Sequence, residues 1–258
     1  MPLSNFSVPD STSVVNVRII DSTSSIDVHM EGMVSHAIKG HSRFECPAYS
    51  FLIEHPSSGR KVLFDLGVRK DFHNLAPPIT NWLTESGTIC SVEKDVSTST
   101  ALLVGPGFKQ LFTPGYPTNP ESPVLDSDFA GRELRELSFA DSTVKVGRFP
   151  AITLWMRQAT QSVISMLWQE EPFYGIVRPG MLFGDADAAE ETVDKIIEAD
   201  GSKNTFVVIA HDCHLKGVVD LFPKYANDFL KKGWVEKSRW VFLKDFKEAV
   251  DERTDEKL

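Results

Sequence analysis

The feature that most constrains this chain is an apolar run that ends directly in four polar, titratable residues. Residues 206–210 read Phe-Val-Val-Ile-Ala, and His211, Asp212, Cys213 and His214 follow at once. Such a run predicts a strand over residues 205–210 that is buried on both faces, as in the interior of a layered α/β fold. Loops at strand ends are held rigidly and remain exposed, so the four residues are the first candidates for a functional site.

Length and charge narrow the kinds of partner. With 258 residues the chain suits one sizeable domain, and we expect a loose arm over residues 1–13, a single domain over residues 14–250 and a charged tail over residues 251–258. The net charge of −9 opposes binding to nucleic acid or to an anionic membrane. A small-molecule substrate is therefore the expected partner, and the sequence leaves the oligomeric state open.

Cysteine usage and targeting signals favour the cytoplasm. Cys46, Cys90 and Cys213 are widely separated, odd in number and form no CxxC pair, which is typical of a reducing compartment. The chain shows no signal-peptide pattern and no apolar run long enough to span a bilayer. We therefore expect a cytoplasmic protein.

Periodicity and turn residues predict the remaining elements. Two hairpins are expected, one joining residues 14–20 to 26–30 through polar residues 21–25, the other joining residues 49–53 to 61–64. The other predicted elements are strands at residues 101–104, 133–139, 143–149 and 240–243, a helix at 188–200, two helical pieces within 215–232 and a poorly capped helix face at 153–168.

Each candidate site residue has a structural explanation beside the functional one. A metal site needs three or four converging ligands, whereas adjacent side chains on an extended chain point in different directions, so residues 211–214 are not a complete site alone. The alternative for His211 is a backbone hydrogen bond at a strand end. Asp65 lies between an apolar strand and Gly67, where a carboxylate more often caps a turn. The lack of a G-x-S-x-G elbow and of a phosphate-binding loop disfavours a serine hydrolase and a nucleotide enzyme.

Several stretches together resemble the metallo-β-lactamase superfamily, in particular its lactonase-like branch of fungal small-molecule metabolism. They occur in the family's order and leave out only about residues 153–170. The matching stretches are residues 47–55, 61–70, 92–96, 101–109, 114–117, 206–212, 233–234 and 240–246.

The resemblance implies an α/β (α+β) fold, an αββα sandwich with a one- or two-zinc site at one edge of its sheets. In such a site a metal-bound hydroxide attacks the carbonyl group of a lactone, ester, thioester or amide. His211 matches the family's final metal-binding histidine, and Asp65 matches the Asp of its Asp-x-Gly near the metal loop. Asp65 and Asp212 are assigned supporting catalytic roles.

The family's metal loop has no counterpart in the sequence. No H-x-H-x-D-H motif occurs, and only residues 97–100 stand where a helix, a strand and that loop are expected. Residues 152–169 contain no His or Asp where a later His and a bridging Asp are expected. Because one histidine cannot hold a catalytic zinc, we expect both the sandwich and its zinc site to be incomplete.

Three outcomes remain open at this point. The first is a hydrolase of a lactone, ester or thioester in secondary-metabolite biosynthesis, with His211 as the surviving zinc ligand. The second is a non-catalytic protein that binds a small molecule or a partner protein through the sheet edge left by the missing segments. The third is a chain that does not fold stably, because unpaired backbone groups are costly in a protein with a margin of only about 5–15 kcal/mol.

Overall fold

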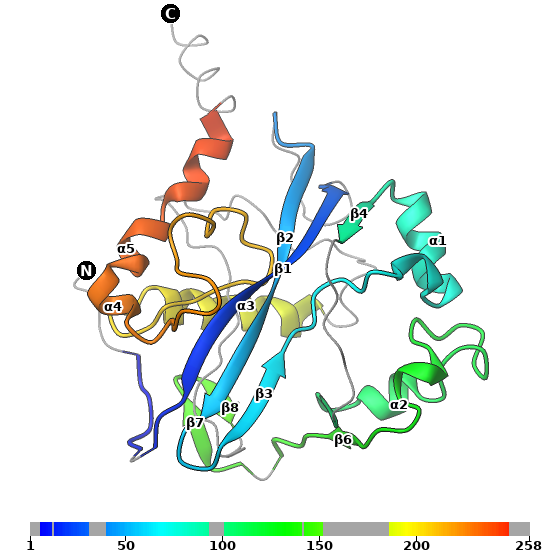
Figure 1. Ribbon diagram of the computed structural model, residues 1–258, viewed down its shortest axis with the longest axis horizontal. Helices are drawn as coiled ribbons and strands as arrows, with labels where there is room; N and C mark the ends of the chain where they lie inside the picture. The colour runs from blue at the N-terminus through cyan, green and yellow to red at the C-terminus, as the bar shows by residue number, and fades with distance from the viewer. Residues whose placement is uncertain are drawn as a thin grey trace, which may run out of the picture.

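The framework of the protein is a four-stranded antiparallel sheet. The computed structural model describes residues 6–247 except residues 12, 31–39, 93–100, 141 and 152–185, so the candidate helix at 153–168 and the tail at 251–258 lie outside the described residues. The strand order is β3-β2-β1-β4, and β1 and β2 form the long twisted ribbons at the centre of Figure 1. The strands are β1 (Asn16–His29), β2 (Arg43–His55), β3 (Arg60–Phe64) and β4 (Ile89–Val92).

Two short sheets and several short helices surround this framework. The parallel pair is β5 (Leu102–Val104) with β6 (Leu134–Glu136), and the antiparallel pair is β7 (Val144–Val146) with β8 (Phe149–Ala151). The α-helices are α1 (Pro77–Glu85), α2 (Phe108–Phe112), α3 (Ala186–Asp200), α4 (Phe229–Lys232) and α5 (Trp234–Ser238), and the 3-10 helices are η1 (Phe72–Asn74), η2 (Asp126–Asp128) and η3 (Val241–Phe246). No helix among the described residues has the length and apolar character needed to cross a membrane. This mixture of helices and strands in separate sheets agrees with the predicted α/β class.

The first predicted hairpin is wrong, because residues 16–29 form one continuous strand. The register of β1 against β2 shifts between Asp21 and Ser25 instead of reversing. Two local contacts stabilise this irregularity: the Ser22 hydroxyl donates to the Ala48 carbonyl, and the Thr23 amide donates to Asp21 at 2.9 Å. A polar stretch whose groups find partners within the sheet produces a bulge rather than a turn.

Two other predictions are confirmed. β2 pairs with β3 from Phe51 opposite Phe64 to His55 opposite Arg60, as the turn residues between them indicate. The helix predicted at residues 188–200 is α3, with Asp187 in its first turn.

The apolar segments near the C-terminus are not strands. Residues 205–210 carry no strand assignment, and the chain at 240–243 forms the start of η3. Within residues 215–232 only α4 is helical, and Gly233 ends it with a φ of 64°. The apolar run reflects burial rather than strand pairing. Phe206 and Val208 pack against the core, although the described structure shows no strand pairing for residues 205–210.

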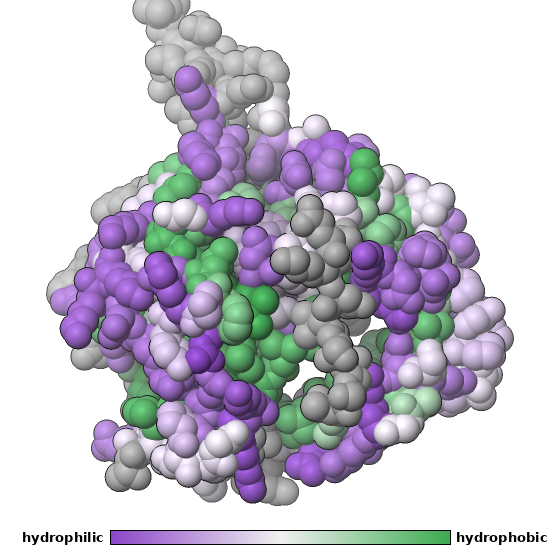
Figure 2. All heavy atoms as spheres, in the orientation of Figure 1, coloured by the Kyte–Doolittle hydropathy of each residue, from purple (hydrophilic) through white to green (hydrophobic). Residues whose placement is uncertain are grey.

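The core is built between β1, β2 and the C-terminal third of the chain. Its buried members are Ile19, Tyr49, Phe51, Ala210, Leu215, Val219, Ala226 and Trp234. Three of them, Ile19, Tyr49 and Leu215, are at most 1% exposed. Figure 2 shows that apolar residues also reach the surface in the middle of one face, bordered by hydrophilic residues.

The edge of β1 that faces away from β2 is shared by two segments. β4 pairs with residues 24–27 of β1. Farther along the same strand, Phe222 donates to the Ile19 carbonyl at 2.7 Å and Ala226 donates to the Val17 carbonyl at 2.8 Å. Arg18 holds the covering segment through a hydrogen bond from its Nε to the Pro223 carbonyl, 3.1 Å long.

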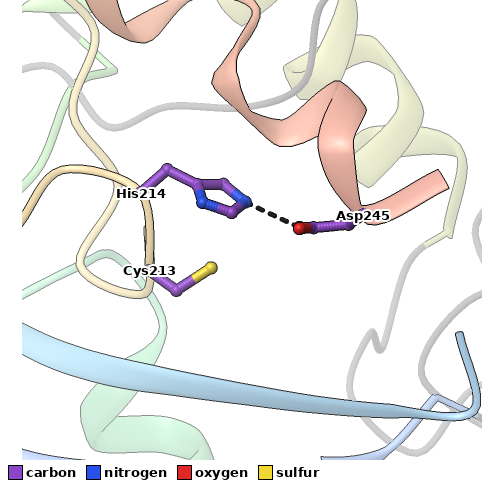
Figure 3. A group of neighbouring side chains, drawn as sticks. All are labelled: Cys213, His214 and Asp245. Carbon is purple, nitrogen blue, oxygen red and sulfur yellow. Dashed lines mark hydrogen bonds and ion pairs between the residues drawn. The ribbon is translucent and has the colours of Figure 1, made fainter. Parts of the chain in front are cut away.

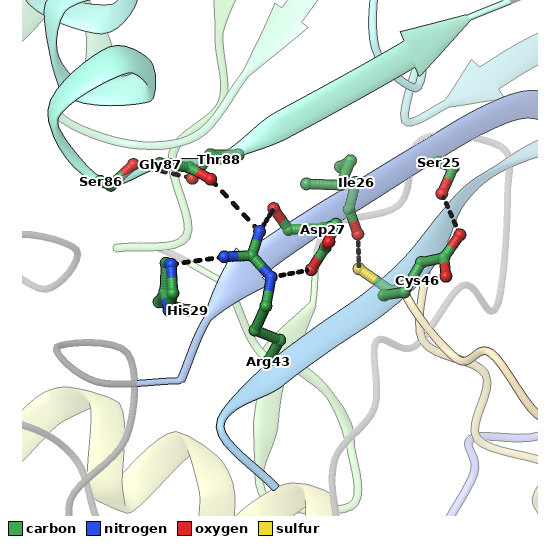
Figure 4. A network of polar contacts seen from close by, with 10 residues as sticks. Ser25, Ile26, Asp27, His29, Arg43, Cys46, Ser86, Gly87 and Thr88 are labelled. Carbon is green, nitrogen blue, oxygen red and sulfur yellow. Dashed lines mark hydrogen bonds and ion pairs between the residues drawn. The ribbon is translucent and has the colours of Figure 1, made fainter.

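An arginine joins the other end of this sheet to the turn before β4. Arg43 Nε donates to the Asp27 carboxylate at 2.9 Å, and its Nη2 donates to the Gly87 carbonyl at 3.2 Å (Figure 4). The guanidinium also contacts His29. One side chain therefore connects β1, β2 and the turn that leads into β4.

Part of the segment predicted to be a loose arm is anchored. Phe6 is buried, its amide donates to the Asn204 side chain at 2.6 Å, and Asn204 donates back to the Phe6 carbonyl at 3.0 Å. The Gly147 amide donates to the Ser7 backbone carbonyl at 2.6 Å, and a Cβ on this glycine would collide with the Phe6 ring.

Because Tyr49 is buried, the fold should lose stability at alkaline pH. Burial, followed by the nearby Asp21 charge, raises the pKa of Tyr49 to about 12 from an ordinary value near 10. Between these two values the unfolded chain releases the phenol proton while the folded chain keeps it, so stability falls as pH rises. We expect a loss of about 3 kcal/mol between roughly pH 10 and pH 12.

Chemical unfolding measured from pH 8 to pH 12 tests this expectation. Tyr49→Phe should lose this part of the pH dependence, whereas Tyr225→Phe, at a 43% exposed position, should keep it. If the free energy of unfolding fell equally with pH in wild type and in Tyr49→Phe, Tyr49 would not be the source of this pH dependence.

Candidate functional site

The loop that carries residues 211–214 is anchored at both ends by buried residues. On one side Ala210 is 2% exposed, and its carbonyl accepts a 2.8 Å hydrogen bond from the Tyr49 amide on β2. On the other side Leu215 is completely buried in the core. The four polar residues between them are therefore presented on a fixed support at the surface.

His211 is exposed, and its ring is oriented by one backbone contact. Nδ1 lies 2.8 Å from the Pro47 carbonyl oxygen. Since a carbonyl only accepts, Nδ1 must carry the hydrogen, and the lone pair of the neutral ring is then on Nε2. This is the backbone hydrogen bond predicted as the alternative, although no strand ends here, and such a contact is also the usual support of a metal-binding histidine.

Asp65 closes a turn at the end of β3. It has a φ of 58°, and its carboxylate accepts a 2.9 Å hydrogen bond from the Gly67 amide. Within the described residues no hydrogen bond or ion pair joins Asp65 to His211 or Asp212. The structure therefore displays the turn contact, and a catalytic role for Asp65 remains a prediction.

Asp212 shapes the loop through its side chain. Its carboxylate accepts a 2.8 Å hydrogen bond from the His214 amide. Burial raises the pKa of Asp212, the hydrogen bond from His214 opposes that rise, and the Asp245 charge adds to it. Asp212 therefore lies next to a second group of polar residues.

That second group consists of Cys213, His214 and Asp245. Their nearest ligand atoms all lie within 4.8 Å of one another, and all three residues are half-buried. His214 Nε2 contacts the Asp245 carboxylate at 2.6 Å. Figure 3 shows the Cys213 thiol and the His214 ring on the same side of their loop, with Asp245 approaching from η3. Burial raises the pKa of the Cys213 thiol, and the charges of Asp245 and Asp212 raise it further.

The sequence pointed to two of the three members of this group. Cys213 and His214 stand beside His211 in the predicted cluster, but the argument that neighbouring side chains diverge assumed an extended chain. Residues 211–214 instead turn, so these two neighbours face the same region. Asp245 carries no local signal, because it lies 31 residues from His214 and just beyond the strand predicted at residues 240–243.

The described residues do not surround His211 with metal ligands. The group of Cys213, His214 and Asp245 is the one place in the described chain where three or more His, Cys, Asp or Glu side chains converge, and His211 is not a member. A zinc ion at His211 therefore does not fit the ligands that the structure places there.

Comparison with known proteins finds relatives along nearly the whole chain. The chain is 28% identical to the γ-lactamase FDB1 of Fusarium pseudograminearum (strain CS3096), over 93% of this chain and 84% of FDB1. It is 27% identical to the metallo-hydrolase mfmC of Annulohypoxylon moriforme, over 94% of this chain and 90% of mfmC. These relatives support a fungal metallo-β-lactamase-like family.

Another relative of the chain is much longer. The cytochrome P450 monooxygenase mpaDE of Penicillium roqueforti (strain FM164) is 28% identical over 95% of this chain, which spans only 39% of mpaDE. No family model and no solved structure matches the chain.

The lengths of the matched regions agree with the segments missing from the sequence. The match to mfmC extends over 343 positions, although the whole chain has 258 residues. The relative therefore has many residues inside the matched region that have no counterpart here. The name metallo-hydrolase also suggests a metal cofactor, without identifying the metal.

Proposed function

We propose that the chain is a hydrolase of the metallo-β-lactamase type that opens a lactone, ester or thioester in fungal secondary metabolism, in the cytoplasm. A cyclic carbonyl compound is the favoured substrate class, because two relatives are named γ-lactamases. The three free cysteines support a reducing compartment.

The observation that carries this proposal is the 2.8 Å hydrogen bond between His211 Nδ1 and the Pro47 carbonyl. It fixes the ring orientation and places the lone pair on Nε2 of an exposed histidine. In this proposal Nε2 is the reactive atom of His211, Asp212 holds the loop in shape, and Asp65 fixes the neighbouring turn.

A second function is favoured by the absence of further ligands around His211 in the described structure. A chain that keeps the fold without a complete catalytic centre would bind a small molecule or a partner protein without turning it over. The two functions differ in whether a substrate is consumed.

Hydrolysis of a panel of lactones, thioesters and cyclic amides, with and without added zinc, separates them. We expect His211→Ala to lower kcat/KM by about 100-fold or more, which is the usual effect of removing a positioned acid–base group. His73→Ala is the matched control, because His73 is an exposed histidine on η1.

The folded state of both variants is checked by their thermal unfolding. Turnover that survives in His211→Ala would contradict the assigned role of this residue. Binding of the panel without any turnover, with or without zinc, would favour the non-catalytic function.

A further inference from the structure

We propose that Cys213, His214 and Asp245 form a zinc-binding site that is separate from the one predicted at His211. The proposal concerns the ion alone, and it stands whether or not the chain hydrolyses a substrate.

The spacing of the three side chains suits a single ion. Zinc binds sulfur at about 2.3 Å and imidazole nitrogen at about 2.0–2.1 Å, so ligand atoms around it lie roughly 3–4 Å apart. Here the ligand atoms lie within 4.8 Å of one another, and His214 and Asp245 are in contact at 2.6 Å. Small side-chain shifts that part the His–Asp pair and bring the thiol closer would produce the required spacing.

Two of the three ligands are followed in the chain by a buried residue. His214 precedes Leu215, which is fully buried, and its amide is fixed by the Asp212 carboxylate. Asp245 precedes Phe246, which is 8% exposed and packs edge-on against Phe242. Such preorganisation reduces the ordering that metal binding would otherwise require.

Low solvent exposure and nearby carboxylate charge distinguish the group of Cys213, His214 and Asp245 from an ordinary surface cluster. The side chains of His214 and Asp245 are only 11% and 27% exposed. Asp212 adds a second carboxylate beside Cys213, and Lys244 is the neighbouring cation in sequence. A divalent cation would balance the carboxylates, and the proton released from the Cys213 thiol on binding would pass to solvent.

The donor set selects the class of ion. A thiolate with an imidazole and a carboxylate suits zinc, whereas calcium and magnesium prefer oxygen ligands throughout. Three protein ligands leave a fourth position for water, as in zinc sites with an open position.

The first experiment measures metal binding without any reference to activity. Chelator-treated full-length protein is titrated with zinc against a chromophoric competitor, and separately with cobalt(II), whose thiolate complexes give a characteristic charge-transfer absorption. We expect one ion per chain, a thiolate band with cobalt, and about 100-fold or greater loss of zinc affinity in Cys213→Ser and in Asp245→Asn.

Two variants serve as controls. Cys90→Ser removes another half-buried cysteine, on β4, and His211→Ala removes the histidine that matches the family ligand. Both should keep the zinc affinity and the cobalt band. Loss of zinc in His211→Ala, or unchanged affinity in Cys213→Ser, would overturn the proposal.

A second measurement uses only the wild-type protein and so does not depend on how the variants fold. Alkylation with iodoacetamide is mapped by mass spectrometry with and without zinc. Zinc should slow the modification of Cys213 and leave that of Cys90 unchanged. Equal modification of Cys213 in both conditions would overturn the proposal.

Discussion

Replacing Leu215 by alanine is expected to lower the free energy of unfolding by about 2–5 kcal/mol. Leu215 is completely buried in the same cluster as Ile19, Tyr49 and Trp234. Truncation removes apolar surface from the core and leaves a cavity, because well-packed neighbours collapse only partly into the space. The effect is large for one further reason: Leu215 anchors the loop that carries residues 211–214.

Denaturant unfolding of wild type and Leu215→Ala measures this loss. Leu111→Ala is the matched control, since Leu111 on α2 is 68% exposed and its truncation should change stability by less than about 0.5 kcal/mol. A loss below about 1 kcal/mol in Leu215→Ala would mean that this part of the core is not packed as described.

The second large effect is expected for Gly67→Ala, which should lower the free energy of unfolding by about 2–5 kcal/mol. Gly67 has a φ of 67°, which strains any residue with a Cβ. A Cβ there would lie 2.6 Å from Ser22 Oγ and 2.9 Å from Ser22 Cβ. Ser22 is buried and engaged with the Ala48 carbonyl and with Ser24, so it cannot move away without losing hydrogen bonds.

Gly59→Ala separates the two causes. Gly59 has nearly the same backbone angle, 66°, but a Cβ there would meet no atom within 4 Å. Its replacement should show the conformational strain alone, about 1–2 kcal/mol. Equal losses in the two variants, measured by denaturant unfolding, would show that the close approach to Ser22 does not contribute.

Two local signals in the sequence predicted local structure correctly, whereas the polar residues 21–25, interpreted as a turn, lie within β1. The turn residues between β2 and β3 and the pattern of α3 are properties of neighbouring residues, and both elements form as expected. Apolar runs indicate burial, but they were less informative about whether the segment pairs as a strand. Residues 205–210 are apolar because they contact the core, and the sequence alone does not reveal whether a strand partner is present.

In the candidate site, too, the features carried by neighbouring residues were predicted and those that depend on the fold were not. The run from His211 to His214 was visible because its members are adjacent, but the direction of each side chain depends on a turn that the apolar pattern did not predict. Asp245 was missed because the contact with His214 arises only when η3 packs beside the loop. A site assembled from distant segments leaves no spacing in the sequence to detect.

The segment that covers β1 protects the protein from self-association through this strand edge. Residues 222 and 226 occupy backbone carbonyls of Ile19 and Val17 that would otherwise be open to another chain. This segment follows directly from the loop that holds Cys213 and His214. A disturbance that pulls the loop away from the core would also draw this segment off β1 and uncover a strand edge that can pair with another chain.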